Sequence, residues 1–434
     1  MRALLTGTST FFAPLLIRGF GLRGVDVTAA DSRWISMGKA SRHVGRRMCL
    51  PVLSRQPEAY LKALVRELKA VPYDLLLPTF EESLLLAEYR DELVPYTQLF
   101  LPPFEAVWQV HHKPSLYRLC QDLRIPAPLT IVPQGPTRLE HEAASLQFPV
   151  VVKLPAANNC VGRSFCENLP ELIARYSELY EQETRRGSAP PFIQQKINGD
   201  PIYTLMLCHE GQKLGEVIYR PLRTYPERGG TSAHRESIEH PGIAALTERL
   251  AKATGWSGFL GLDFIIDGND GTPFLIDANP RANPGIQLGF LAGVDWAGIL
   301  IDLVRGRCRA PVAARPGIRT RSFMLDFAWL LEGCVPHRRW LQNACNRISK
   351  YRKPDWDLTV PNEFLTNGEW GCTLAMAYQG LTGAVKSLFT GQQIGQTILD
   401  DVNYDAVTTT RLRVAKQSAP CLQSAIAIGE SPFV

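Results

Sequence analysis

The hydrophobic positions of the first hundred residues alternate between short continuous runs and helical spacing. Runs such as VDVTAAD (25–31) and YDLLLP (73–78) are typical of strands, and the second is typical of a buried parallel strand. Strands are expected at 2–5, 25–31, 73–78 and 98–103, and helices at 11–20, 57–68 and 81–90. This alternation predicts a doubly wound, Rossmann-like α/β domain over residues 1–103.

The pattern changes after residue 103, where strands become more frequent. Helices are expected at 104–122, 169–184, 242–254 and 296–305, and strands at 148–154, 191–197, 202–209, 213–220, 258–267 and 272–280. NGDP (198–201) predicts a turn, GNDG predicts a hairpin between the last two strands, and the Arg-, Gly- and Pro-rich stretch 221–240 predicts a long loop. The expected fold class is therefore α/β combined with α+β.

Residues 311–434 show a weaker pattern. Their spacing favours helices at 322–332 and 338–349, a Pro- and Asp-rich loop at 351–368, and a polar, irregular stretch at 385–434. The pattern assigns no chemistry here and leaves three roles open: capping a pocket, contacting a second subunit, or binding a carrier protein.

Composition narrows the class of protein. The 434 residues are 45% hydrophobic and 21% charged, which is close to the average of soluble globular proteins, and the length predicts about three domains. The net charge of +5 is mild and demands neither a nucleic acid nor a membrane partner. Ten cysteines without a C-x-x-C pair indicate reduced thiols in a cytoplasmic protein. The interrupted apolar start MRALLTGTST predicts strand, turn and helix rather than a signal peptide.

One glycine motif has the wrong context for a nucleotide site. RGFGLRG (18–24) contains G-x-G-x-x-G, but a dinucleotide fingerprint follows a strand and opens a helix, whereas this motif follows a predicted helix and precedes a predicted strand. A helix end with turn glycines explains it better. The chain also has no G-x-x-x-x-G-K-[ST] motif. These observations argue against a nicotinamide-dependent oxidoreductase built on the first domain.

A lysine inside a strand is the first candidate for ligand chemistry. Lys153 interrupts the apolar run FPVVVKL, where burial is costly unless an anion meets the ammonium group. An edge lysine that keeps its head group in water is the alternative. The small polar loop 156–164 that follows, which contains Gly162 and Ser164, suits backbone N–H groups that approach phosphates.

The segment GLDFIIDGNDGTPFLIDANPR adds oxygen donors. Asp277 and Asn279 lie two residues apart and share a strand face, and Asp263 comes near that face if the hairpin pairs. Two carboxylates and an amide suit Mg²⁺, which proteins often hold with one or two carboxylates plus substrate phosphates. A solvated strand end is the alternative. Arg281, two residues further on, could clamp a phosphate or a carboxylate in bidentate fashion.

In their order and spacing, these residues resemble the ATP-grasp superfamily over about residues 1–305. The similarity rests on the α/β domain, the lysines in HHKPSLYRLC and VVVKLP, the small polar loop, the strand FIQQKINGD, the loop RPLRTYPERGGTS and the D…D-x-N-P-R ending. Within this superfamily, the chain most resembles the branch that contains carboxylate–amine ligases and carbamoyl-phosphate-synthetase-like domains. The resemblance implies a Rossmann-like domain (1–103), a small ATP-grasp lobe (104–193), a large lobe (194–310) and an extension of unknown role (311–434).

The resemblance also implies ATP and Mg²⁺ as cofactors and a role for each matched residue. It places Lys113 and Lys153 on the ATP phosphates, the loop with Gly162 and Ser164 over them, Gln195, Lys196 and Ile197 at the adenine, Asp200 at the ribose, Asp263, Asp277 and Asn279 on Mg²⁺, and Arg281 on the transferring phosphoryl group or acyl phosphate.

The basic loop 220–235 is a candidate lid. It is expected to close over the site and exclude water, with Arg220 and Arg223 as candidates to bind a substrate carboxylate and His234 as a candidate base for the amine. A solvated, charged surface loop is the alternative.

The implied function is an ATP-dependent ligase. It would join a small, amino-acid-like carboxylate to an amine through an acyl phosphate, releasing ADP and phosphate. A homodimer is the default assembly. Because Asp277 stands where the family usually has the longer Glu, a non-catalytic ATP-binding regulatory or scaffolding module stays open as the alternative.

Overall fold

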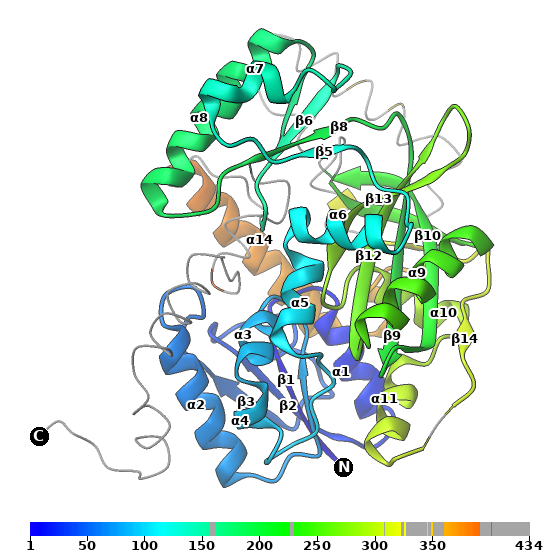
Figure 1. The fold of residues 1–434 in the computed structure, drawn as a ribbon. Helices are drawn as coiled ribbons and strands as arrows, with labels where there is room; N and C mark the ends of the chain where they lie inside the picture. The colour runs from blue at the N-terminus through cyan, green and yellow to red at the C-terminus, as the bar shows by residue number, and fades with distance from the viewer. Residues whose placement is uncertain are drawn as a thin grey trace, which may run out of the picture.

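The computed structural model describes residues 1–156, 162–225, 230–307, 309–322, 325–326, 345, 349, 360–390 and 401. This part of the chain forms three sheets with helices packed around them (Figure 1). A parallel sheet is combined with two antiparallel ones, so the predicted mixture of α/β and α+β architecture is confirmed.

The parallel sheet forms the N-terminal domain. Its order is β3-β2-β1-β4, from β1 (Arg2–Thr6), β2 (Asp26–Asp31), β3 (Arg46–Cys49) and β4 (Leu75–Pro78). Its helices are α1 (Ala13–Gly21), α2 (Pro57–Ala70), α3 (Glu82–Glu88) and α4 (Arg90–Leu93). Because α1 ends within RGFGLRG and Gly24 has a φ of 71°, the glycines of this motif close a helix and form a turn, as predicted.

The predicted strand 98–103 is wrong. It is reduced to one parallel bridge between Gln98 and Leu75. Pro102 and Pro103 have no N–H group to donate to a neighbouring strand, which explains why pairing stops there.

Two helices connect this domain to the rest of the chain. They are α5 (Phe104–His111) and α6 (Lys113–Asp122), which lie beside the large sheet in Figure 1. The backbone N–H of Lys113 donates to the Pro155 carbonyl at 2.9 Å. The start of α6 is thereby tied to the end of the strand that carries Lys153.

A small lobe follows. Its antiparallel sheet has the order β5-β8-β6-β7, from β5 (Thr130–Ile131), β6 (Val150–Lys153), β7 (Ser164–Cys166) and β8 (Phe192–Gln195). It is covered by α7 (Leu139–Glu142), preceded by the short 3-10 helix Pro136–Arg138, and by α8 (Leu169–Arg186). The side chain of Asn168 caps α8 by accepting from the Glu171 N–H, and Gly187 ends the helix with a φ of 68°.

The large lobe is a seven-stranded sheet. Six strands have the order β13-β12-β9-β10-β11-β15, and β14 pairs with β10. The strands are β9 (Gly199–His209), β10 (Gln212–Tyr225), β11 (Thr231–Ile238), β12 (Gly258–Asp267), β13 (Pro273–Asn279), β14 (Val312–Ala313) and β15 (Arg319–Arg321). The helices are α9 (Pro241–Thr254), α10 (Gly285–Ala292) and α11 (Trp296–Val304).

Two predictions for this lobe are wrong. The expected loop 221–240 consists mainly of the paired ends of β10 and β11, with a register shift at Pro221 that accommodates the missing N–H group. The expected turn at 198–201 is instead the start of β9, where Gly199 pairs with Asp267. A Cβ at Gly199 would lie 1.8 Å from the Ile266 carbonyl oxygen, so this glycine serves a close backbone approach rather than a turn.

Part of the C-terminal extension forms a long helix. The 3-10 helix Leu365–Asn367 leads into α14 (Trp370–Thr390), a stretch for which the sequence predicted no helix and whose last residues it predicted as irregular. The predicted helices 322–332 and 338–349 lie almost wholly outside the described residues.

Three hydrophobic cores hold these parts. One joins the N-terminal domain, α5, α6 and one face of the large sheet, including Leu64, Leu116 and Phe264. A second joins α1, α10 and α11 to the opposite faces of the same two sheets, including Phe20 and Trp296. The small lobe has a core of its own, which contains Val152 and Tyr176.

Across the part of the chain that the structure describes, no single helix is long and apolar enough to cross a membrane. The bent pair Gly285–Ala292 and Trp296–Val304 passes the same length and composition test together, at an angle of 89°.

Candidate functional site

The β12–β13 hairpin brings the predicted carboxylates together. Asp263 and Asp277 lie directly opposite each other in the antiparallel register, and Asn279 pairs with Gly261 two residues further along. Directly opposed residues share a face of the sheet, so two carboxyl groups are held side by side. The predicted pairing of this hairpin is confirmed.

Both predicted lysines point toward this region. Lys113, at the start of α6, has a side chain only 7% exposed, and its Nζ lies 3.2 Å from Asp277 Oδ1. Lys153, at the end of β6, donates from Nζ to Gln194 Oε1 of β8 at 2.7 Å. Two separate elements therefore contribute ammonium groups to the same site.

The charge balance around Asp263 shows how closely these groups converge. Burial and the neighbouring Asp277 carboxylate raise the pKa of Asp263 to about 7, while Arg281, Lys113 and Lys153 act in the opposite direction. Such effects need groups within roughly ten ångströms, because interactions between charges weaken with distance. These charged groups therefore all act on the Asp263 carboxylate, and the ligand roles that the sequence assigns to them stay predictions.

Arg281 is held by four contacts. Its guanidinium lies over the Phe80 ring at 4.3 Å and 4.0 Å from Glu81 Oε1, and it donates to Asn279 Oδ1 at 3.0 Å and to the Ala282 carbonyl at 3.3 Å. Burial lowers the pKa of this arginine, and the acidic neighbours oppose that effect. The guanidinium is thus fixed in orientation beside the paired carboxylates.

Sequence reasoning missed several residues that shape this site. Phe80 and Glu81 follow β4, and the carboxyl end of a parallel strand is the signal that could have identified them. Tyr117 of α6 donates to the Ile276 carbonyl at 2.7 Å and fixes the helix against β13.

His111 is buried beside Lys113. Desolvation and that ammonium group lower the pKa of His111 to about 3, so the imidazole is neutral at physiological pH.

The predicted nucleotide-binding segment, residues 195–200, runs from the end of β8 in the small lobe to the start of β9. Gln195 ends β8, and its backbone N–H donates to the Leu129 carbonyl at 2.8 Å; Lys196 donates likewise to Pro149 at 3.4 Å. Ile197 is half-buried and Asp200 is exposed on β9. Asp200 pairs with Ile266 of β12, so this segment lies beside the strand that carries Asp263 but nearer the tip of the hairpin.

Gly162 and Ser164 lie in the part of the predicted phosphate loop (156–164) that the structure describes. Gly162 has a φ of 63°, and a Cβ there would lie 2.4 Å from Leu154 Cδ1, so only glycine fits without strain. Ser164 begins β7 and pairs with Val152. The loop residues 157–161 lie outside the described residues.

Arg220 and Arg223 are engaged by carboxylates of the chain. Arg220 donates to Glu236 Oε2 at 2.6 Å. Its neighbour Tyr219 belongs to the cross-strand row that contains Asp263, so Arg220 projects from the opposite face of the sheet. Arg223 donates to Asp326 Oδ1 at 2.6 Å in a buried pair.

His234 lies opposite Arg223 in the β10–β11 register. Burial and the surrounding arginines lower its pKa to about 4. The predicted lid (220–235) contains two adjacent glycines at 229 and 230. It falls only partly within the described chain, since residues 226–229 are outside it.

The donor set at the hairpin fits a hard cation and phosphates. Within the described ranges no group of three or more His, Cys, Asp or Glu side chains is arranged to hold a metal. Two opposed carboxylates with an amide nearby are nevertheless the oxygen donors that Mg²⁺ takes when phosphates complete its shell. Burial and the neighbouring Asp277 carboxylate raise the pKa of Asp263, and a divalent ion held by the two carboxylates would favour their charged forms.

Comparison with known proteins supports the fold. No protein-family model matches the chain. The carbamoyl phosphate synthase large chain of Deinococcus radiodurans is 22% identical over 189 residues, which are 41% of this chain but only 18% of that protein. The chain therefore spans less than a fifth of the length of this curated relative.

Two solved structures extend the likeness over most of the chain. The biotin carboxylase domain of Hydrogenobacter thermophilus 2-oxoglutarate carboxylase, a dimer in complex with MgADP, ADP and bicarbonate, superposes with a TM-score of 0.61 at 17% identity and covers 73% of each chain. An L-amino acid ligase from Bacillus licheniformis gives 0.57 at 17% identity, over 73% of this chain and 78% of that one. At such low identities the likeness establishes the arrangement of the sheets and helices.

Proposed function

We propose that this chain, which has the ATP-grasp fold, is an ATP-dependent ligase that joins a small carboxylate to an amine. The observation that carries the proposal is the convergence of Lys113, Lys153 and Arg281 on the opposed carboxylates of Asp263 and Asp277. Cations and buried carboxylates in this combination suit a metal-bound triphosphate. None of these side chains has to act as a nucleophile for that chemistry.

The proposed reaction has two steps. The substrate carboxylate takes the γ-phosphoryl group of ATP and releases ADP, and the amine then displaces phosphate from the acyl phosphate to form an amide. Such phosphoryl transfer depends on positioning and on neutralising charge rather than on covalent help from the protein. Lys113 and Lys153 supply positive charge from two different elements, and Arg281 supplies a fixed bidentate donor.

The remaining assignments are part of the same proposal. Asp263, Asp277 and Asn279 would hold Mg²⁺, Gly162 and Ser164 would cover the phosphates, Gln195, Lys196 and Ile197 would contact the adenine, and Asp200 the ribose. When bound, Mg²⁺ would neutralise charge that develops on the phosphate oxygens. Arg223 remains a candidate for the substrate carboxylate only if that carboxylate competes with Asp326.

The substrates we propose are small amino-acid-like molecules. One structural neighbour is by name an L-amino acid ligase, and another is a carboxylase domain crystallised with bicarbonate, so proteins of this fold act on small carboxylate-like molecules. The neighbouring carboxylase domain is a dimer, and we propose a homodimer for this chain as well.

The test is ADP release with pooled amino acids and other small carboxylates. The wild-type chain should sustain ADP release over many turnovers only when a carboxylate and an amine are both present, because the amine is needed to clear the acyl phosphate formed in the first step. Asp277→Asn keeps the shape of the side chain but removes its charge, so turnover should fall by about 100-fold or more and require more Mg²⁺. The control is Asp270→Asn, which changes an exposed aspartate in the tip of the same hairpin.

Two results would contradict the proposal. Nucleotide binding without turnover on any substrate pair would favour the non-catalytic binding module. Equal activity in Asp277→Asn and wild type would remove this carboxylate from the site.

A further inference from the structure

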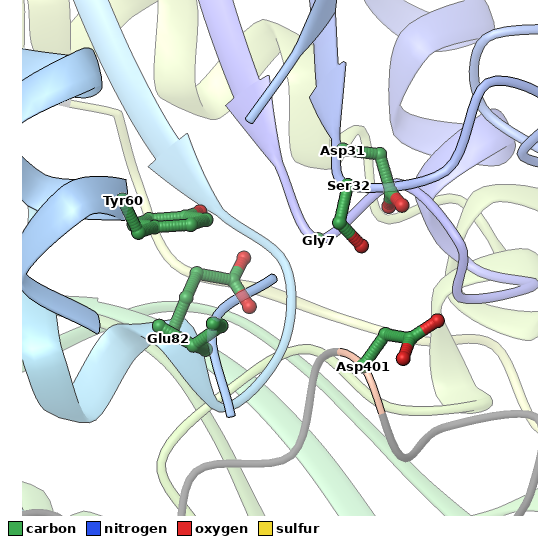
Figure 2. Close-up of a pocket in the computed structure, with 7 residues that line it drawn as sticks. Gly7, Asp31, Ser32, Tyr60, Glu82 and Asp401 are labelled. Atoms are coloured by element: carbon green, nitrogen blue, oxygen red, sulfur yellow. The ribbon is translucent and has the colours of Figure 1, made fainter. Parts of the chain in front are cut away.

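A small cavity lies at the carboxyl edge of the parallel sheet. Figure 2 shows Gly7, Asp31 and Ser32 on one side of it, Tyr60 and Glu82 on the other, and Asp401 of the C-terminal extension facing the gap. The loop after β1, the end of β2 and the start of α3 after β4 meet here. This edge is where open α/β sheets bind ligands. The space accommodates about one water-sized group.

Glu82 presents an unsatisfied oxygen to this cavity. The side chain is 1% exposed. Its Oε1 accepts from Thr6 Oγ1 at 2.9 Å, from the Thr79 N–H at 2.8 Å and from the Phe80 N–H at 3.2 Å. Its Oε2 is buried and has no hydrogen-bond partner within the described chain. A buried carboxylate oxygen without a donor is rare and costly, which points to a ligand that supplies one.

Ser32 provides a second unsatisfied group at the same place. Its Oγ is also buried without a hydrogen-bond partner among the residues that the structure describes. Gly7 makes room for the arrangement: a Cβ there would lie 2.4 Å from Glu82 Oε1, and its φ of 64° favours glycine. The absence of a side chain at position 7 therefore leaves the space that the Glu82 carboxylate occupies.

The other carboxylates of the cavity already have donors or cations beside them. Asp31 accepts from the Ser9 N–H and hydroxyl at 2.7 and 2.8 Å, with Lys39 and Arg33 close enough to lower its pKa against the effect of burial. Asp401 pairs with Arg33 at 3.1 Å. The hydrogen bonds to Glu82, in contrast, come from neutral groups, and burial raises its pKa. Among the residues that the structure describes, no Lys, Arg or His forms an ion pair with the Glu82 carboxylate.

The cavity is adjacent to the proposed reaction centre. Phe80 lies under the Arg281 guanidinium, Glu81 is 4.0 Å from it, and Glu82 is the next residue in the chain. The charge of Glu82 is also among those that act on Arg281. The carboxylate that faces the cavity is therefore one residue away from the contacts that orient Arg281.

We propose that this cavity binds a primary ammonium group of a substrate, with Glu82 Oε2 and Ser32 Oγ as acceptors. An ammonium group is close to water in size, carries three donors and supplies positive charge, whereas three surrounding carboxylates repel anions. This proposal rests on the proposed function, because it takes the bound molecule to be a substrate of the ligase. The ammonium group comes either from the amine that is joined or from an amino acid that supplies the carboxylate.

Calorimetric titration of the full chain with methylammonium chloride tests the cavity directly, with sodium chloride as the blank. We expect saturable binding that weakens by about tenfold or more in Glu82→Gln, which keeps the shape and the backbone contacts but loses the charge. Ser32→Ala should weaken binding about threefold, and it keeps the test decisive if Glu82→Gln fails to fold. The control is Asp26→Asn, which alters an aspartate paired with Arg2 at the opposite edge of the same sheet.

Titration with glycine and with acetate identifies the source of the ammonium group. Glycine binding that is at least tenfold tighter than methylammonium binding assigns the site to an amino acid, and equal binding assigns it to a simple amine. Acetate should not depend on Glu82. Failure of methylammonium and glycine to bind, or equal binding by Glu82→Gln and wild type, would overturn the inference.

Binding of a non-hydrolysable ATP analogue with Mg²⁺ is measured on the same proteins. Analogue binding without ammonium binding would reject the cavity alone. Ammonium binding without analogue binding would reject the proposed ATP chemistry while leaving the ammonium site in place.

Discussion

Each lysine of the candidate site has a different kind of acceptor. Lys113 meets a carboxylate, Asp277, whereas Lys153 meets the neutral amide of Gln194. A carboxylate offsets most of the charge of its partner, but an amide orients an ammonium group without cancelling its charge. At the scale of single residues, the Gln194 amide therefore orients the Lys153 ammonium group from β8.

Lys153→Ala should lower phosphate release by about 100-fold or more, because it removes an oriented charge from the phosphoryl-transfer site. The strand should survive, since alanine in place of a half-buried side chain at the end of β6 leaves its pairing with β8 intact. Phosphate release and the thermal midpoint are measured together. Lys252→Ala is the control, because that lysine pairs with Glu248 on the surface of α9. Activity within twofold of wild type would show that Lys153 has no role in turnover.

At the scale of elements, the N-terminal domain and the large sheet approach each other most tightly at Gly258 among the close contacts described above. Gly258 begins β12 with a φ of 95°, and a Cβ there would lie 2.2 Å from the Phe100 carbonyl oxygen. The strand that carries Asp263 therefore packs directly against the backbone of the first domain. Neither the conformation nor the contact leaves room for a side chain.

Gly258→Ala should destabilise the chain more than Gly271→Ala. Both glycines have positive φ, but a Cβ at Gly271 would have no atom of the described chain within 4 Å. Both variants carry about 1–3 kcal/mol of backbone strain, and only Gly258→Ala adds the clash with Phe100. Denaturant unfolding compares the two midpoints. Equal midpoints would mean that the close contact between Gly258 and Phe100 contributes little to the free energy of unfolding.

Strong patterns predicted elements well, and context decided the rest. The runs around Lys153, Asp263 and Asp277 predicted the strands and the hairpin, because apolar runs and a four-residue turn signal are local, whereas the exact register came from the structure. The β10–β11 extension was missed because Arg220 and Glu236 are stabilised across strands, and such cross-strand pairs do not show in one strand's sequence. Glu82 was missed for the same reason: its role depends on Gly7, 75 positions earlier.

At the scale of the whole molecule, the C-terminal extension is integrated into the large lobe. Arg235 of β11 and Glu363 form an ion pair at 2.8 Å whose side chains are 0% and 1% exposed. Arg235 also donates to the Pro284 carbonyl. Removing one partner of such a pair leaves a buried charge without compensation. The small lobe, in contrast, has a core of its own, which includes Val152 beside Lys153.

Glu363→Ala should cost about 3–5 kcal/mol of stability, since it strands the Arg235 charge in the interior. Glu181→Ala, which breaks an exposed pair with Arg185 on α8, should cost less than about 1 kcal/mol. Chemical denaturation of both variants beside wild type measures the difference. A loss at Glu363 no larger than that at Glu181 would show that the extension is only loosely attached.

The ion pair between Arg235 and Glu363 also sets an order of events during synthesis. The ribosome makes Arg235 well before Glu363, so a nascent chain that has already emerged as far as β11 carries a guanidinium group with no counter-charge. The same late segment supplies Glu369, which lies 3.4 Å from His43 of the first domain. These buried contacts can therefore form only after translation has passed residue 369.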